Sequence, residues 1–245
     1  MLERDYLRRG IAEFVGTFAL IFIAAGGAAY AQAPVDLALA NGLVIAVMVS
    51  AFAFISGGHF NPAVTLGFFV TRRISPLLAC WYWIVQFSGA ALAALLLKWV
   101  LPAGAQSAGN LGVPHLGTGI TAGKGVVVEA VLTFFLVWVV FATAVDARGS
   151  FAQIAGLAIG FTIAFGVLMG YGITGAAMNP ARAFGPQLVG DHWAHFWVWY
   201  IGPFAGGVIA AALYELLYLR KDAPEPVGPP ETGVEEPGAG DAALS

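Results

Sequence analysis

The chain has 245 residues, of which 59% are hydrophobic and only 10% are charged, and its mean hydropathy is +0.82. Soluble domains carry about 25% charged residues, so this composition excludes an ordinary soluble globular protein and indicates a membrane protein. The net charge of −3 and the scattered basic residues argue against a nucleic-acid partner. The single cysteine excludes an intrachain disulfide and a cysteine-based metal cluster.

Six apolar segments are long enough to cross a lipid bilayer, which takes about 20 mostly apolar residues in a helix. These predicted spans are 11–31, 37–55, 77–101, 125–145, 151–171 and 193–219. Two further apolar segments, 62–70 and 180–189, are too short to cross. These lengths predict an all-α membrane protein with six transmembrane helices and two short segments that enter the membrane without crossing it.

Most of the arginines fall on one side of the membrane if the six helices alternate in direction: Arg4, Arg8, Arg9, Arg72, Arg73, Arg148 and Arg220. Because basic loops face the cytoplasm, both termini are predicted to be cytoplasmic. Residues 1–10 are then a cytoplasmic N-terminus, and the Pro-, Gly- and Glu-rich residues 221–245 are a disordered cytoplasmic tail. The short loops favour a bacterial inner membrane.

The chain repeats itself at a spacing of about 117 residues. The segment 59–63 recurs as 177–181, and the segment 86–89 recurs as 203–206. With three spans in each copy, the second copy enters the membrane upside down, which is the inverted-repeat plan of many transport proteins. The predicted units are a first repeat over 11–122 and a second repeat over 123–220.

Both short segments begin with the same triplet, Asn61-Pro62-Ala63 and Asn179-Pro180-Ala181. Asparagine is a favoured N-cap and proline is favoured at the first helical position, so the triplets predict half-helices over 61–71 and 179–189. Because the copies are inverted, the half-helices should meet by their N-termini at a water-filled cavity, since backbone cannot end in lipid. Their positive N-terminal ends and the two asparagine amides would orient water there and repel cations and hydronium.

The segments before the triplets are rich in small residues, with Gly57, Gly58 and His59 in the first copy and Thr174 and Gly175 in the second. Their backbone carbonyls are expected to form a file of hydrogen-bond acceptors along the pore. His59 could be a metal ligand or a proton relay, but no second ligand lies at suitable spacing. A backbone-positioning role is therefore favoured, and neither a metal nor a cofactor is expected.

Glu13 and Glu129 stand inside apolar spans, where a carboxylate is a candidate functional group. Because they occupy equivalent positions in the repeat, we expect both to accept hydrogen bonds from backbone N–H groups of the loops before the half-helices. A proton pathway, the alternative, would need further titratable partners within the spans.

These residues resemble the aquaporin (major intrinsic protein) family over roughly residues 12 to 218. The resemblance rests on the segments 12–18, 56–65, 178–182 and 202–203, together with Gln86. It implies a homotetramer in the lipid bilayer, with one pore in each protomer and passive transport without ion conduction. It also implies a four-residue selectivity filter, which falls at Asn41, Val167, Ala176 and Arg182.

This filter departs from that of strictly water-selective members, which carry an aromatic residue and a histidine where Asn41 and Val167 stand. The smaller side chains predict a wider channel for water and for small uncharged solutes such as glycerol, urea or metalloid hydroxides. Ala183 and the aromatic pair at 199–200 resemble water-selective members instead, which is the alternative. Asn41 could also be bonded only to the backbone of its own helix.

Two other classes of function are less consistent with the sequence. A secondary transporter would need an ionisable or ligand-coordinating cluster at the membrane midplane, where this chain places Asn, Pro, Ala and Gly. A non-conducting structural tetramer would not need two intact triplets and Arg182. No enzymatic activity is expected.

Overall fold

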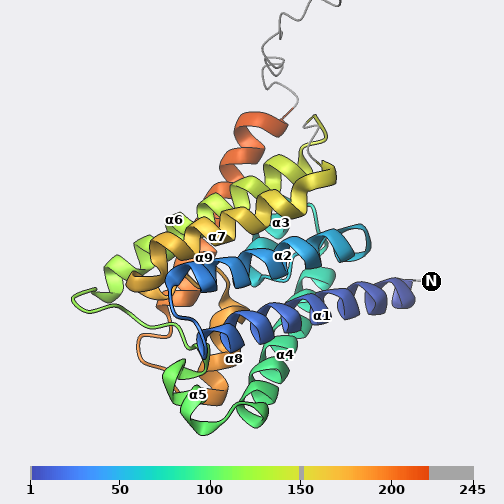
Figure 1. The fold of residues 1–245 in the computed structure, drawn as a ribbon. Coiled ribbons are helices and arrows are strands. Elements are labelled where there is room, and N and C mark those ends of the chain that lie inside the picture. The colour runs from blue at the N-terminus through green and yellow to red at the C-terminus, as the bar shows by residue number, and fades with distance from the viewer. Residues whose placement is uncertain (1, 149–151, 221–245) are drawn as a thin grey trace, which may run out of the picture.

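The computed structural model describes residues 2–148 and 152–220, so the predicted tail over 221–245 lies outside the described residues. Six of its helices are long and apolar enough to cross a membrane, and no strand occurs in the described part (Figure 1). They are α1 (Leu2–Ala28), α2 (Pro34–Ser56), α4 (Pro76–Val100), α6 (Ala122–Val140), α7 (Ala155–Thr174) and α9 (Val198–Tyr214). The predicted all-α membrane fold is confirmed.

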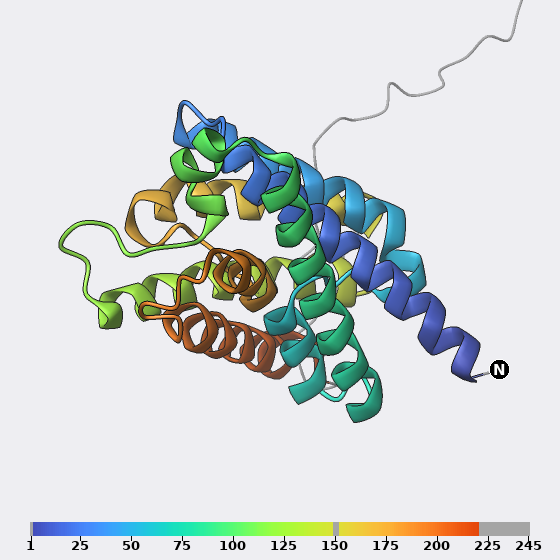
Figure 2. The ribbon, with the colours of Figure 1, turned by 90° about the horizontal axis from the view of Figure 1, so that it is seen from below.

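Two short helices, α3 (Pro62–Val70) and α8 (Pro180–Gly190), lie among the long ones (Figure 2). The 9 residues of α3 span about 14 Å at 1.5 Å per residue, roughly half of a 30 Å hydrocarbon core. Each begins with a proline at its first position, preceded by an asparagine N-cap in extended conformation. The local chemistry of the triplets therefore accounts for where both half-helices start.

The two repeats interlock. Helix α1 packs on α4 as α6 packs on α9, and α2 packs on α7 across the repeat boundary. Each half-helix packs mainly on the last helix of the other repeat, since α3 lies against α9 and α8 lies against α4. The predicted units 11–122 and 123–220 are therefore related in sequence but share one interior.

Glycines at equivalent positions allow the closest helix pairs to form. A Cβ added at Gly89 of α4 would lie 2.6 Å from the carbonyl oxygen of Phe14 in α1. A Cβ added at Gly206 of α9 would collide with the carbonyl oxygen of Ala130 in α6. Because real Cβ atoms do not approach a carbonyl so closely, any larger residue there would push the helices apart.

Several boundaries differ from the predicted ones. Helix α1 begins at Leu2, because residues 2–9 contain no glycine or proline that would end it. Residues 2–10 therefore extend the first predicted span. Helix α9 begins at Val198, and the residues from 191 to 197 form turns before it. The short elements outside the predicted spans are α5 (Ala103–Ala108) and η1 (Asn110–Gly112). Three others lie within predicted spans, namely η2 (Phe141–Val145), η3 (Ala152–Ile154) and η4 (Glu215–Leu219).

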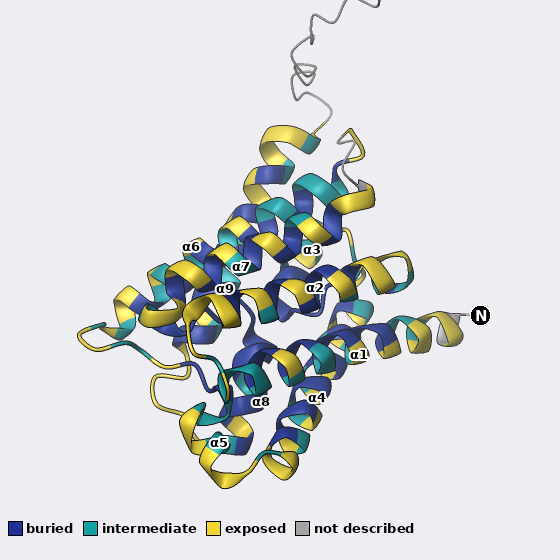
Figure 3. Cartoon of the chain, viewed as in Figure 1, coloured by how far each residue is buried: buried dark blue, intermediate teal, exposed yellow. Residues whose placement is uncertain are grey.

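The outer faces of the long helices are apolar and exposed, whereas their inner faces are buried (Figure 3). Phe54, Leu77 and Trp99 are 83%, 70% and 81% exposed. Apolar side chains at that exposure are costly in water but favourable in lipid. Cys80, the single cysteine, is exposed on α4.

Candidate functional site

The caps of the two half-helices face each other at the centre of the bundle. Asn61 Oδ1 accepts a hydrogen bond from the N–H of Ala63 (2.8 Å). Asn179 Oδ1 accepts from the N–H groups of Ala181 (2.9 Å) and Arg182 (3.2 Å). Both asparagine residues are only 4% exposed, so these caps satisfy N–H groups that water would not reach.

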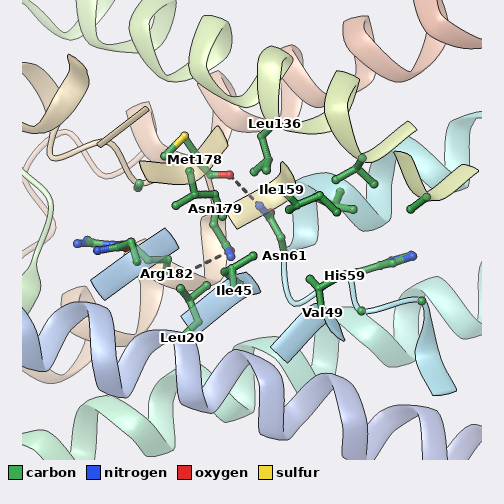
Figure 4. Close-up of a pocket in the computed structure, with 18 residues that line it drawn as sticks. Leu20, Ile45, Val49, His59, Asn61, Leu136, Ile159, Met178, Asn179 and Arg182 are labelled. Carbon is green, nitrogen blue, oxygen red and sulfur yellow. Dashed lines mark hydrogen bonds between the residues drawn. The ribbon is translucent and has the colours of Figure 1, made fainter. Parts of the chain in front are cut away.

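The same two side chains also join the repeats. Asn61 Nδ2 donates to the Met178 carbonyl and Asn179 Nδ2 donates to the Phe60 carbonyl, each at 2.8 Å (Figure 4). The exchange is reciprocal, as expected for an inverted repeat. One N–H of each amide donates to the carbonyl of the other repeat, and the second N–H remains available to donate to a solute.

A narrow cavity lies beside the two asparagines. The centres of water molecules can occupy about 30 Å³ of it. One water needs about 10–15 Å³ of such space, so the cavity holds two or three. Its polar side chains are Asn41, His59, Asn61, Asn179 and Arg182, and most of its other lining side chains are aliphatic. His59 and Arg182 lie on opposite sides of the asparagine pair (Figure 4).

The loops before the half-helices hold strained backbone at matching positions. Phe60 and Met178 have φ values of 48° and 51°, in the left-handed region that favours glycine. Gly58 has a φ of 63°, and its equivalent Ala176 has a φ of 48°, although alanine carries a Cβ. Such conformations persist only where the surroundings hold them.

Glu13 and Glu129 hold these loops. Glu13 Oε1 accepts from the Ser56 hydroxyl (2.7 Å) and the His59 N–H (2.9 Å), and Oε2 accepts from the Phe60 N–H (2.7 Å) and Gln86 Nε2 (2.9 Å). Four accepted bonds occupy all the lone pairs of a carboxylate.

Glu129 holds the corresponding loop of the second repeat. It accepts from the Thr174 hydroxyl (2.7 Å) and from the N–H groups of Ala177 (2.9 Å) and Met178 (2.8 Å). Both carboxylates are fully buried, and each bonds the N–H of a residue with positive φ, Phe60 or Met178. These bonds indicate that both carboxylates stabilise the loops before the half-helices.

Not all of the residues predicted to form the file of carbonyls line the cavity. Residues 57–59 line the cavity, whereas Thr174 and Gly175 are not among its lining residues and 177–178 line it instead. The Thr174 carbonyl accepts from Trp199 Nε1 (2.9 Å), so it is turned toward α9 and away from the pore.

Of the four predicted filter residues, Asn41 and Arg182 line the cavity, whereas Val167 and Ala176 are not among its lining residues and are each 2% exposed. Asn41 Nδ2 donates to the Leu37 carbonyl (2.8 Å), the contact expected if Asn41 bonds its own helix. The residue also lines the cavity, so the bond to its own helix does not remove it from the cavity wall.

Arg182 reaches from the first turn of α8 to the loop before α6. Its Nη1 donates to the Gly112 carbonyl (2.7 Å), while its buried Nε has no partner among the described residues. Glu129 supplies a nearby opposite charge. The guanidinium is thus fixed beside the cavity with donors still available.

His59 borders the cavity through its side chain. Its Nδ1 lies 3.0 Å from Thr65 Oγ1, and its ring packs on Phe68 (centroids 4.3 Å apart) and Tyr82 (5.3 Å). No group of three or more His, Cys, Asp or Glu side chains in residues 2–148 and 152–220 is arranged to hold a metal ion.

A separate ionic cluster stands where α6 and α9 finish. Asp146 accepts from Arg148 Nε (2.9 Å), from Arg148 Nη2 (2.8 Å) and from the Tyr214 hydroxyl (3.1 Å). The Arg148 guanidinium holds the pKa of Asp146 at about 2, and the same contact raises the pKa of Arg148. Arg73 pairs with Glu215 at 2.8 Å. None of these residues lines the cavity, so they tie helix ends together.

Sequence reasoning missed Gly112 and Tyr82, and it did not predict the hydrogen bonds that Thr65 and Trp199 make. Tyr82 and Trp199 lie 117 residues apart, and each donates to the carbonyl of the last residue of α2 or α7. Extending the repeat to these two positions would have found them. Gly112 contributes only a loop carbonyl and gives no sequence signal.

Comparison with known proteins agrees with this geometry. The model of the family named Major intrinsic protein matches residues 2–214. "Probable aquaporin TIP3-2" of Arabidopsis thaliana is 39% identical over 250 residues, which cover 95% of this chain and 90% of the relative. "Aquaporin-4" of Mus musculus is 41% identical over 215 residues, covering 84% and 66%. The X-ray structure of the aquaglyceroporin from Plasmodium falciparum has a TM-score of 0.77 over 86% of this chain and 96% of that chain; at 24% identity it indicates a shared fold.

Proposed function

The chain belongs to the major intrinsic protein family of membrane channels, and on that premise we propose that it conducts water and small uncharged solutes such as glycerol, urea and metalloid hydroxides. The observation that carries the proposal is the cavity at the junction of α3 and α8, bordered by both asparagine caps. A passive channel needs a cavity through which the solute can move and no catalytic group.

We propose that the channel excludes ions and protons, and the charges around this cavity support that proposal. The N-termini of both half-helices point at it, and each carries partial positive charge. Arg182 adds a full positive charge at one side. No carboxylate of residues 2–148 and 152–220 lines the cavity, so a cation would lose its hydration without an opposite charge to compensate.

The range of solutes depends on the side chains beside Arg182. Asn41 borders the cavity where a larger aromatic residue would narrow it, which supports passage of small solutes. Strict water selectivity is the second candidate, favoured by the small space of about 30 Å³ and by the bond that holds the Asn41 amide to its own helix.

Assembly and orientation complete the proposal. We propose a homotetramer in the lipid bilayer because the chain belongs to this family, with one pore per protomer because the cavity lies within one chain. Both termini are placed in the cytoplasm because the arginine-rich side of a membrane protein faces it. The relatives named above come from a plant and the mouse and give no support to a bacterial inner membrane. A secondary transporter is set aside because the relatives are channels.

Osmotic swelling and shrinkage of proteoliposomes test the proposal. Stopped-flow light scattering would compare wild type with Asn41→Phe in water, glycerol and urea. We expect water flux above that of empty liposomes, with low activation energy, no ion conductance, and solute flux that Asn41→Phe reduces more than water flux. Val47→Phe is the matched control, because Val47 lies on the same helix and is 57% exposed. Water flux equal to empty liposomes would refute the channel, and water flux without solute flux would favour strict water selectivity.

A further inference from the structure

The ring of His59 has one nitrogen bonded to protein and one free toward the pore. Nδ1 lies 3.0 Å from Thr65 Oγ1, while Nε2 has no partner in the part of the chain that the structure describes. His59 borders the cavity. Which nitrogen carries the proton decides whether the pore meets a donor or an acceptor.

A chain of hydrogen bonds starting at Glu13 fixes that choice. The Glu13 carboxylate can only accept, so Gln86 must turn its NH₂ group toward Glu13 Oε2 (2.9 Å). The same nitrogen, Gln86 Nε2, lies 3.0 Å from Thr65 Oγ1 and can only donate to it.

Thr65 therefore accepts from Gln86 and has one hydrogen of its own to place. Thr65 is fully buried, and the only other partner of its hydroxyl among the described residues is His59 Nδ1. If His59 also donated from Nδ1, the hydroxyl hydrogen would be buried without an acceptor, which is unfavourable. The hydroxyl thus donates to Nδ1, and the ring proton stands on Nε2.

The second repeat lacks this network. The equivalents of His59, Thr65 and Gln86 are Ala177, Ala183 and Pro203. The second loop is nevertheless held by Glu129 and its half-helix is capped by Asn179. The network is therefore not required to build the loop, and its only point of contact with the cavity is His59.

We propose that Thr65 and Gln86 are positioning residues that lock His59 in the neutral Nε2–H tautomer, making it a fixed donor to water on the side of the asparagine pair opposite Arg182 (Figure 4). A proton relay would need Nε2 to accept a proton from water and Nδ1 to release one. In the Nε2–H tautomer, Nε2 already carries the ring proton and has no lone pair to accept another. Nδ1 accepts from the Thr65 hydroxyl and has no proton to release, so this step is blocked. Tyr82 is the titratable group that packs on the ring, and Glu13 contacts His59 through its backbone N–H.

The inference rests on the proposed channel function, and Thr65→Val tests it by removing the hydroxyl at nearly constant volume. Nitrogen NMR of histidine-labelled protein in bilayers reads the tautomer, and stopped-flow light scattering with a lumenal pH dye reads water and proton flux. We expect wild-type His59 to remain Nε2–H between about pH 5 and 8, with constant water permeability. In Thr65→Val no hydroxyl donates to Nδ1, so part of His59 should shift to the Nδ1–H tautomer, and water permeability should change because the pore then meets an acceptor in place of a donor.

Thr65→Ser should behave as wild type because it keeps the hydroxyl. Thr133→Val is the matched control, because Thr133 is fully buried and its hydroxyl has no partner within the described residues. A wild-type spectrum with Nδ1–H, or with a titrating His59, would overturn the inference even if the valine variant failed to fold. Identical spectra for wild type and Thr65→Val would overturn it as well. Absence of water flux in wild type would instead refute the channel, since the tautomer is read without transport.

Discussion

Replacing Glu129 by glutamine removes one accepted hydrogen bond from a loop that holds strained backbone. In the wild type the carboxylate accepts three bonds at 2.7–2.9 Å. Glutamine keeps one oxygen, which can still serve the Thr174 hydroxyl and the Ala177 N–H. Its NH₂ group then faces the Met178 N–H, and two donors meet.

The expected cost follows from that single unsatisfied group. A buried N–H without an acceptor costs about 1–3 kcal/mol. At about 2–4 °C per kcal/mol for a chain of this size, Glu129→Gln should lower the melting temperature by about 2–12 °C. Met178 has a φ of 51° and its carbonyl accepts from Asn61, so water permeability should fall as well.

Thermal unfolding of the purified protein in detergent, paired with stopped-flow permeability in liposomes, measures both effects. Thr133→Val serves as control: it lies one turn away on α6, is fully buried and should leave both readouts nearly unchanged. If Glu129→Gln melts with wild-type protein and conducts at the wild-type rate, the carboxylate does not hold the loop and our account of it is wrong.

Three further predictions concern the packing and the helix ends. Gly206→Val should prevent α9 from packing on α6 and abolish a monodisperse gel-filtration peak, whereas Gly172→Ala, where an added Cβ meets nothing within 4 Å, should preserve it. Because its pKa is depressed to about 2 in the folded protein against about 3.9 unfolded, Asp146 contributes stability above about pH 4. The melting difference between wild type and Asp146→Asn should therefore shrink as pH falls from about 4 toward 2, and a constant difference would contradict this. A double-mutant cycle between Arg73 and Glu215, which are 32% and 28% exposed, should give a coupling of about 0–1 kcal/mol, with a larger value refuting a surface pair.

Local chemistry was sufficient to predict the half-helices, since Asn61 and Asn179 start them through their own side chains. The contacts between the two repeats could not be predicted from local chemistry. The bonds between Asn61 and Met178 and between Asn179 and Phe60 join residues 117 and 119 positions apart. No local preference specifies such pairs.

The sequence could not predict which of the four filter residues line the cavity. The resemblance placed Asn41, Val167, Ala176 and Arg182 together, but only Asn41 and Arg182 border the cavity. Arg182 is fixed by the carbonyl of Gly112, a loop residue without a motif. The sequence pattern cannot distinguish a side chain that reaches the cavity from one buried just behind it.

The interlocked half-helices have a consequence for synthesis on the ribosome. Helix α3 is made early, yet it packs mainly on α9, the last long helix to leave the ribosome. Its cap likewise bonds a carbonyl of the second repeat. Until α9 has been inserted, α3 has α4 beside it but lacks its main neighbour. Its cap lacks the Met178 carbonyl until the second repeat has been made, so the first half of the chain cannot complete its packing ahead of the second. The pore is completed only at the end of translation, and a nascent chain truncated before α9 has no closed path to leak through.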